Sequence, residues 1–382
     1  MIFMTDVIFE YYISDRSTPV KKSDDLWDAL LPSDMQAENS DSSATVGHYF
    51  DTASSFLKND GFSVVRAGVN KVENLQILSE DINKIEVYLV KHGQFYHPAR
   101  VDVVLADTSV SFALNLAVSE GGVACVEREY PVLEKLSQWV TDIPAVFGTG
   151  KVVSERGDEF SMFLAKWFDG YNEFHISYED GVKRVIVWDY DNGFNYLSEQ
   201  DVFALYKKAA FIMTQSYNPK TFEQIQPWHH AAGDFVVKND DGGIDVKLIT
   251  VRQYTSLFEN SFDDAESILE ALLIFFIGLS IRMRLDRVDG VAESVWADEI
   301  VLVAVVGGFF AGIEGFDSPD VFGGDFVGSF KKYISDVDSD TIDEFSMMIA
   351  GSYHPESSDY SIVAENIQAH VAAFVIEVRK AV

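Results

Sequence analysis

Residues 227–237 (PWHHAAGDFVV) contain side chains that could act in catalysis or ligand binding. Two adjacent histidines in this segment precede an aspartate. His229 or His230 could accept a proton or bind a ligand, because histidine changes its charge near neutral pH. Asp234 could bind a cation or orient a hydroxyl group. Histidines in a tight loop can equally well hydrogen-bond backbone carbonyls and hold the loop together. The sequence therefore leaves a catalytic and a structural role open for this loop.

A second group of candidates lies farther towards the N-terminus, around His92 and His97. These two histidines flank a turn between two expected strands, and Lys91 precedes them. Together they could meet an anion. We take His92 as a ligand-binding candidate, together with His175 and His230.

The N-terminal half of the chain is predicted to form a small mixed sheet, which would position His92 and His97. A helix is predicted over residues 45–59 from its apolar stripe, and Asp60-Gly61 ends it. From residue 85 the hydrophobic period becomes that of extended chain. The predicted elements that follow are strands over 85–90, 99–105 and 111–118, a helix over 126–139, and strands over 145–153 and 160–167.

The C-terminal half reads as mainly helical, with one short hairpin. Helices are predicted over residues 197–216, 262–286 and 362–382, and a hairpin with strands over 234–237 and 246–250. Residues 271–281 and 300–313 are too short to span a membrane and are predicted to be buried helices, apolar on all sides. The expected fold class is α+β.

Composition narrows the possible partners and the location. The chain of 382 residues carries 29 Lys+Arg against 61 Asp+Glu, a net charge of −32. Such a surface repels phosphate backbones and anionic lipids, so we expect neither a nucleic-acid nor a membrane partner. Cys125 alone cannot form an internal disulfide, and the N-terminus lacks the pattern of a secretory signal. These features predict a soluble cytoplasmic protein.

From about residue 85 onwards, the order of elements resembles the protein-kinase-like fold, in the aminoglycoside/choline phosphotransferase branch. Residues 111–117 (SFALNLA) resemble the third strand, and Glu129 lies on the helix whose glutamate pairs with that strand's lysine. Residues 163–170 resemble the hinge strand and its closing glycine. Residues 227–237 are similar to the catalytic loop, and residues 246–252 resemble the strand that carries a metal-binding aspartate.

The resemblance implies a bilobal protein with three parts. Residues 1–80 form an N-terminal extension with a helix, residues 81–169 the small lobe, and residues 170–382 the helical lobe. His175 follows the hinge glycine and would then lie at the mouth of the cleft between the lobes.

The residues that the resemblance leads us to expect for nucleotide binding are missing. Asn115 stands in the place of the strand's lysine, which leaves Glu129 without its family partner. The turn over residues 91–96 has one glycine where phosphate-binding turns use several. These changes argue against ATP binding in the usual mode.

On the catalytic-loop side, His229 takes the place of the acceptor-orienting aspartate, and Asp234 that of the metal-binding asparagine. Thr250 replaces the second metal ligand, and Arg252 puts positive charge where the metal belongs. An alternative alignment places Gly233-Asp234 on the family's Gly-Asp pair and Asn239 on its metal-binding asparagine. Asp234 would then be the catalytic base and Asn239 a metal ligand. In this alignment, however, the apolar strand precedes the asparagine instead of following it.

The predicted function is that of a catalytically degenerate kinase-like protein, which binds a small ligand or a protein partner in or near the cleft. We expect no cofactor and no metal, since no metal-binding spacing is present. An active phosphotransferase or nucleotidyl-transfer enzyme with rearranged catalytic residues is the alternative.

Overall fold

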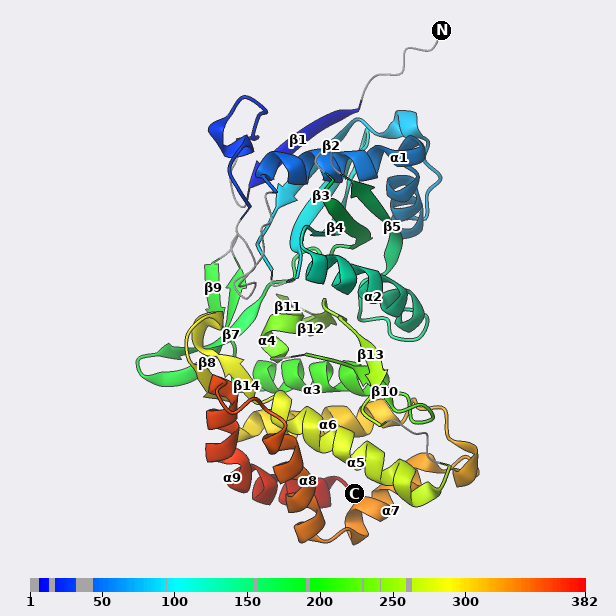
Figure 1. The fold of residues 1–382 in the computed structure, drawn as a ribbon. Coiled ribbons are helices and arrows are strands. Elements are labelled where there is room, and N and C mark those ends of the chain that lie inside the picture. The colour runs from blue at the N-terminus through cyan, green and yellow to red at the C-terminus, as the bar shows by residue number, and fades with distance from the viewer. Residues whose placement is uncertain are drawn as a thin grey trace. The chain divides into compact units, whose positions relative to one another are not determined.

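The computed structural model describes residues 7–13, 18–31, 44–93, 95–153, 157–189, 193–228, 230–240, 242–258 and 263–382. The chain divides into two compact units, Met1–Asp169 and Gly170–Val382. The division falls at Gly170, whose φ of 76° is a conformation that glycine adopts without strain. Figure 1 shows the elements of both units.

The N-terminal unit is built on a six-stranded sheet with strand order β1-β2-β3-β4-β6-β5. Its strands are β1 (Ile8–Ile13), β2 (Lys84–Leu89), β3 (His97–Val104), β4 (Ser109–Ala117), β5 (Val146–Val153) and β6 (Glu159–Lys166). β1 runs parallel to β2, and the other neighbours are antiparallel. Apolar and polar residues alternate along β2, so that one face of this strand is buried and the other is only partly covered. The sheet is therefore mixed, as predicted.

Helix α1 (Val46–Glu73) packs on the apolar face of this sheet. It begins at Thr45, whose hydroxyl accepts a hydrogen bond from the backbone N–H of His48. The backbone leaves the helical conformation from Asn59 to Phe62 and then resumes it. The predicted helix over 45–59 is confirmed, but the second helical segment after the break was not predicted. Through α1 and β1, much of the expected extension over residues 1–80 belongs to the sheet and its core.

Helix α2 (Glu120–Leu136) packs on the opposite face, over β4 and β6. The ring centroids of Tyr130 on α2 and Phe163 on β6 are 6.1 Å apart. Phe163 pairs with Asn115 of β4 in the register, and paired residues in a sheet point to the same side. Asn115 therefore lies on the α2 side of the sheet. Short 3₁₀ turns at Asp25–Trp27 and Ser79–Asp81 complete this unit.

The C-terminal unit is mainly helical. Its helices are α3 (Glu199–Gln215), α4 (Ala231–Asp234), α5 (Ala265–Arg282), α6 (Glu299–Ile313), α7 (Phe326–Asp336), α8 (Ser339–Gly351) and α9 (Ser358–Ala381), with 3₁₀ turns at Val288–Gly290 and Asp320–Phe322. α5 and α6 are buried on most sides, as predicted, and the rings of Phe276 and Phe309 stack at 3.7 Å between them. α6 also packs closely on α3, because Gly308 leaves no side chain between the two helices: a Cβ there would lie 2.2 Å from the carbonyl oxygen of Lys207.

Small sheets surround these helices. They comprise β7 (Phe174–Glu179), β8 (Val182–Asp189) and β9 (Gly193–Tyr196), and the pairs β10 (Glu223–Ile225) with β13 (Tyr254–Ser256), β11 (Phe235–Asp240) with β12 (Gly243–Leu248), and β14 (Leu285–Arg287) with β15 (Ser294–Trp296). The β11–β12 hairpin confirms the predicted one. The β7-β8-β9 sheet and the helices α7 and α8 were not predicted.

Among the described helices, α9 meets the length and hydropathy expected of a membrane-crossing segment, with a mean hydropathy of 1.2. Core helices of soluble proteins meet the same criterion, and α9 packs against α6, α8 and β15. The chain as a whole thus combines an N-terminal mixed sheet with a mainly helical C-terminal part. This is the α+β class predicted, and it is consistent with a kinase-like fold.

Candidate functional site

The loop that the sequence singles out ends in helix α4, whose last residue is Asp234. β11 starts at the next residue, and the backbone carbonyl of Asp234 accepts a hydrogen bond from the N–H of Ile249 at 2.8 Å. Asp234 is therefore fixed at the base of the β11–β12 hairpin. It is 2% exposed.

An arginine from the far side of the same hairpin neutralises this carboxylate. The Nη1 atom of Arg252 lies 3.1 Å from Oδ1 of Asp234, and the side chains are 17% and 3% exposed. The same Nη1 donates to the carbonyl of Pro227, at 3.5 Å. A guanidinium thus occupies one oxygen of the carboxylate that a metal ion would need.

The other metal-site candidates lie on the β11–β12 hairpin and in the segment that follows it. Thr250 is half-buried in the segment between β12 and Arg252. Asn239, the ligand of the alternative alignment, lies near the exposed end of β11 opposite Ile244. Among the residues that the structure describes, no three His, Cys, Asp or Glu side chains gather closely enough to hold a metal ion.

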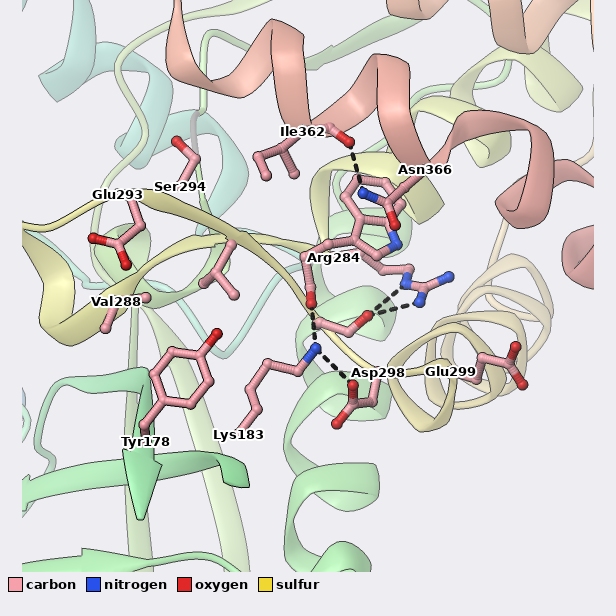
Figure 2. A pocket seen from close by; sticks show the side chains of 13 residues that line it. Tyr178, Lys183, Arg284, Val288, Glu293, Ser294, Asp298, Glu299, Ile362 and Asn366 are labelled. Atoms are coloured by element: carbon pink, nitrogen blue, oxygen red, sulfur yellow. Dashed lines mark hydrogen bonds and ion pairs between the residues drawn. The ribbon is translucent and has the colours of Figure 1, made fainter. Parts of the chain in front are cut away.

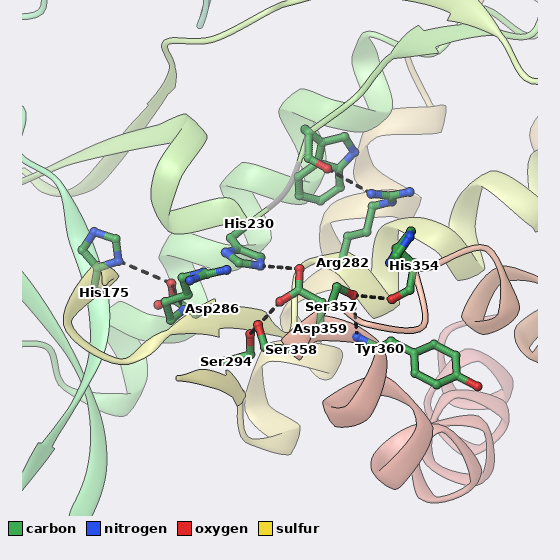
Figure 3. Close-up of polar contacts among 12 residues, drawn as sticks. His175, His230, Arg282, Asp286, Ser294, His354, Ser357, Ser358, Asp359 and Tyr360 are labelled. Atoms are coloured by element: carbon green, nitrogen blue, oxygen red, sulfur yellow. Dashed lines mark hydrogen bonds and ion pairs between the residues drawn. The ribbon is translucent and has the colours of Figure 1, made fainter. Parts of the chain in front are cut away.

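His229 lies outside the described residues, but the neighbouring His230 is described and half-buried. Its Nε2 atom is 3.2 Å from Oδ2 of Asp359, in the first turn of α9 (Figure 3). The other oxygen of Asp359 accepts a hydrogen bond from the hydroxyl of Ser294 at 2.6 Å. Arg282 donates to the carbonyl of Trp228 at 3.0 Å. These contacts attach the loop to α5 and α9, and they attach α9 to the β14–β15 hairpin.

The carboxyl of Asp359 is strongly held in its charged form. Its burial favours the neutral form, but hydrogen bonds from His230 and Ser294 and the nearby charges of His230 and Arg287 outweigh burial and lower its pKa to about 2. An aspartate that orients a histidine also occurs in catalytic sites. Here the pair joins two elements that are 129 residues apart in the sequence, so it ties the loop to the start of α9.

His175 is buried within the C-terminal unit, on β7. Its Nδ1 atom lies 3.3 Å from Asp286, whose other oxygen accepts the backbone N–H of Ile176 at 2.7 Å (Figure 3). The His175 ring also packs against the ring of Trp188, with the ring centroids 4.7 Å apart. Gly290 leaves room for the histidine, because a Cβ atom at position 290 would lie 2.7 Å from Nε2 of His175. With both neighbours and only 7% exposure, His175 is packed as a core histidine.

In the N-terminal unit, Asn115 on β4 and the fully buried Glu129 on α2 lie on the same side of the sheet. The Nδ1 atoms of His92 and His97 are 3.0 Å apart. Burial lowers the pKa of His92, and burial together with the proximity of His92 lowers that of His97 to about 4. Both rings are therefore neutral at pH 7, which weakens the prediction that they attract an anion.

Sequence reasoning missed the partners that the loop finds. Asp359 and Ser294 belong to no recognisable motif, and both are distant from the loop in the sequence. The sequence predicts a positive charge at the expected metal position, Arg252, but not its contact with Asp234. The structure thus gathers His230 with Asp359, and Asp234 with Arg252, into separate polar contacts.

Comparisons with known proteins give little further guidance. No protein-family model matches the chain, and no curated protein matches it. Among solved structures, the chain is similar to WaaP in complex with acyl carrier protein, with 9% sequence identity and a TM-score of 0.36. The similarity covers 77% of this chain and 98% of that chain. At this identity and TM-score it says nothing about activity, substrate or partner.

Proposed function

We propose that this chain is a catalytically degenerate kinase-like protein, which binds a small ligand or a protein partner and does not transfer phosphoryl groups. The observation that carries the proposal is the ion pair between Asp234 and Arg252 at 3.1 Å. Asp234 is the carboxylate that survives at the catalytic-loop position, and it is already neutralised.

The physical requirements of phosphoryl transfer explain why this contact matters. Transfer from ATP depends on cations that neutralise the phosphate charge and on oxygen ligands that hold magnesium. Arg252 repels a metal ion from Asp234, and Thr250 adds no charge. On β4, the neutral Asn115 offers no positive charge to a phosphate. Each lost charge-assisted contact costs about 1.5–3 kcal/mol, so two such losses weaken nucleotide binding by roughly a hundredfold or more.

The test is the melting temperature of the protein with millimolar ATP, with and without magnesium, at matched ionic strength. Magnesium chloride alone and ATP with EDTA serve as controls. We expect no stabilisation that requires both magnesium and ATP. A clear rise that requires both would refute the proposal and favour the active phosphotransferase, in which Asp234 would have to exchange Arg252 for the metal.

A charge-restoring variant sharpens this test. Asn115→Lys combined with Thr250→Asp and Arg252→Ala returns the lysine and one metal ligand and removes the competing cation. If lost charges are the reason that binding is absent, this variant gains magnesium-dependent stabilisation by ATP. The matched control is Arg252→Ala alone, which removes the competing cation but restores neither group.

A further inference from the structure

A pocket of about 410 Å³ lies in the C-terminal unit, where helix α6 begins. Its walls come from β7 and β8, from the β14–β15 hairpin and from α9 (Figure 2). None of the described residues of the loop over 227–234 lines it. Ser294 lines the pocket and also donates to Asp359, so the pocket lies two hydrogen bonds away from His230.

A buried arginine forms part of this wall. Arg284 is 6% exposed, and its Nε and Nη2 atoms donate to the carbonyl of Ala297 at 3.0 and 2.7 Å. Nη1 lies 3.4 Å from Nδ1 of His370. Burial lowers the pKa of Arg284 to about 10, so the guanidinium keeps its charge at neutral pH. No carboxylate of the described residues forms an ion pair with it, although buried charges in proteins are normally paired, and only the charges of Glu299 and Asp298 oppose the effect of burial.

A second cation and a helix N-terminus lie beside this arginine. The Nζ atom of Lys183 contacts the carbonyl of Trp296 and the carboxylate of Asp298, each at 2.6 Å (Figure 2). Asp298 is the N-cap residue of α6, but its side chain makes no capping hydrogen bond. The positive end of the helix therefore keeps N–H groups that no side chain caps.

We propose that this pocket binds a small oxyanion, the carboxylate or phosphate group of a small molecule, through Arg284 and Lys183 at the N-terminus of α6. The anion supplies a counter-charge in direct contact with Arg284, whose nearest opposing charges, Glu299 and Asp298, act on it without forming an ion pair. Exposed carboxylates of Glu293 and Glu299 also line the pocket and oppose anion binding, so free anions bind weakly. A metal ion is disfavoured as the occupant, because no cluster of metal ligands exists among the described residues.

The test is titration of the protein with inorganic phosphate and with malonate, without magnesium or nucleotide. Sodium chloride at matched ionic strength serves as the reference, because screening alone stabilises so acidic a chain. A rise in melting temperature beyond the chloride reference yields the apparent affinity. Stabilisation by phosphate alone identifies a phosphate site, and stabilisation by malonate alone identifies a carboxylate site. If neither anion exceeds chloride, the proposal is wrong.

Variants show whether the binding is at this pocket. Lys183→Met keeps the apolar stem and should weaken binding about tenfold or more, since it removes a charge-assisted contact. Asp298→Asn removes the competing carboxylate and should strengthen binding about twofold to fivefold. Lys332→Gln is the control, because Lys332 has an 80% exposed side chain on α7 and does not line the pocket.

Arg284→Gln should abolish binding if the variant folds. If it does not fold, the Lys183 and Asp298 variants decide the question. Equal affinity in Lys183→Met and the parent, or weaker binding in Asp298→Asn, would overturn the proposal. Because the titrations contain neither magnesium nor ATP, their failure would leave the degenerate-kinase proposal untouched.

Discussion

Replacing Asp359 by Asn tests whether the contact between the loop and α9 is structural. Asparagine keeps the shape of the side chain but removes the charge that His230 and Ser294 stabilise. The pKa of Asp359 lies at about 2 against an ordinary value of 3.8, and the side chain is 18% exposed. Each pKa unit corresponds to about 1.4 kcal/mol, so the charged form contributes on the order of 2 kcal/mol to stability at pH 7.

The pH dependence follows from the direction of this shift. Because the folded protein lowers the pKa, the contribution is complete above about pH 4 and disappears as the pH falls towards 2. The variant should therefore unfold at a lower urea concentration than the parent at pH 7. The difference between the two should shrink as both are acidified through this range.

The assay is urea denaturation followed by circular dichroism at several pH values between about 3 and 7. Asp340→Asn is the control, because Asp340 also lies in the first turn of a helix, α8, but is exposed. That control should lose about 0.3–1 kcal/mol at most, which is the usual contribution of a helix dipole. An Asp359→Asn variant as stable as the control, or a difference that does not change with pH, would refute the reasoning.

Two further substitutions test contacts of the same unit. Arg252→Ala should destabilise the protein by about 2–4 kcal/mol, because it removes the cation beside the buried Asp234, and a urea midpoint equal to that of the parent would contradict the ion pair. Gly308→Ala should lower the melting temperature by several degrees, since its Cβ would lie 2.2 Å from the carbonyl oxygen of Lys207 on α3. Gly351→Ala on α8 is the control: its Cβ would meet no atom within 4 Å, so its melting temperature should be unchanged or slightly raised. Equal melting temperatures of the two alanine variants would show that α3 and α6 are not packed so closely.

Local pattern was sufficient to predict several elements. The apolar stripe over residues 45–59 and the Asp60-Gly61 break correspond to the first segment of α1 and to its non-helical residues. The β11–β12 hairpin and the buried helices α5 and α6 were also predicted, because each depends on residues that are close in the sequence. The β7-β8-β9 sheet was missed although its sequence carries hairpin signals: apolar residues alternate over 174–178, and the turn at Asp180-Gly181 leads into the β-branched run over 182–187.

The candidate site was predictable only in its residue types. The resemblance to the kinase-like fold sets a neutral Asn115 at the expected lysine position and a positive Arg252 next to Thr250, and on that alignment the residue types predict a lack of metal-nucleotide chemistry. No spacing rule joins His230 to Asp359, because the two residues are 129 positions apart and meet only where α9 packs beside the loop.

The sequence by itself determined the helix and strand periods, the apolar cores of both units and the acidic character of the surface. The tertiary structure alone decided that Arg252 pairs with Asp234, that His230 is held by Asp359, and that Arg284 and Lys183 line one pocket. The physical reason is that hydrophobic periods encode which side of an element is buried. Ion pairs and pockets depend instead on how separate elements pack, and no local pattern records those distances.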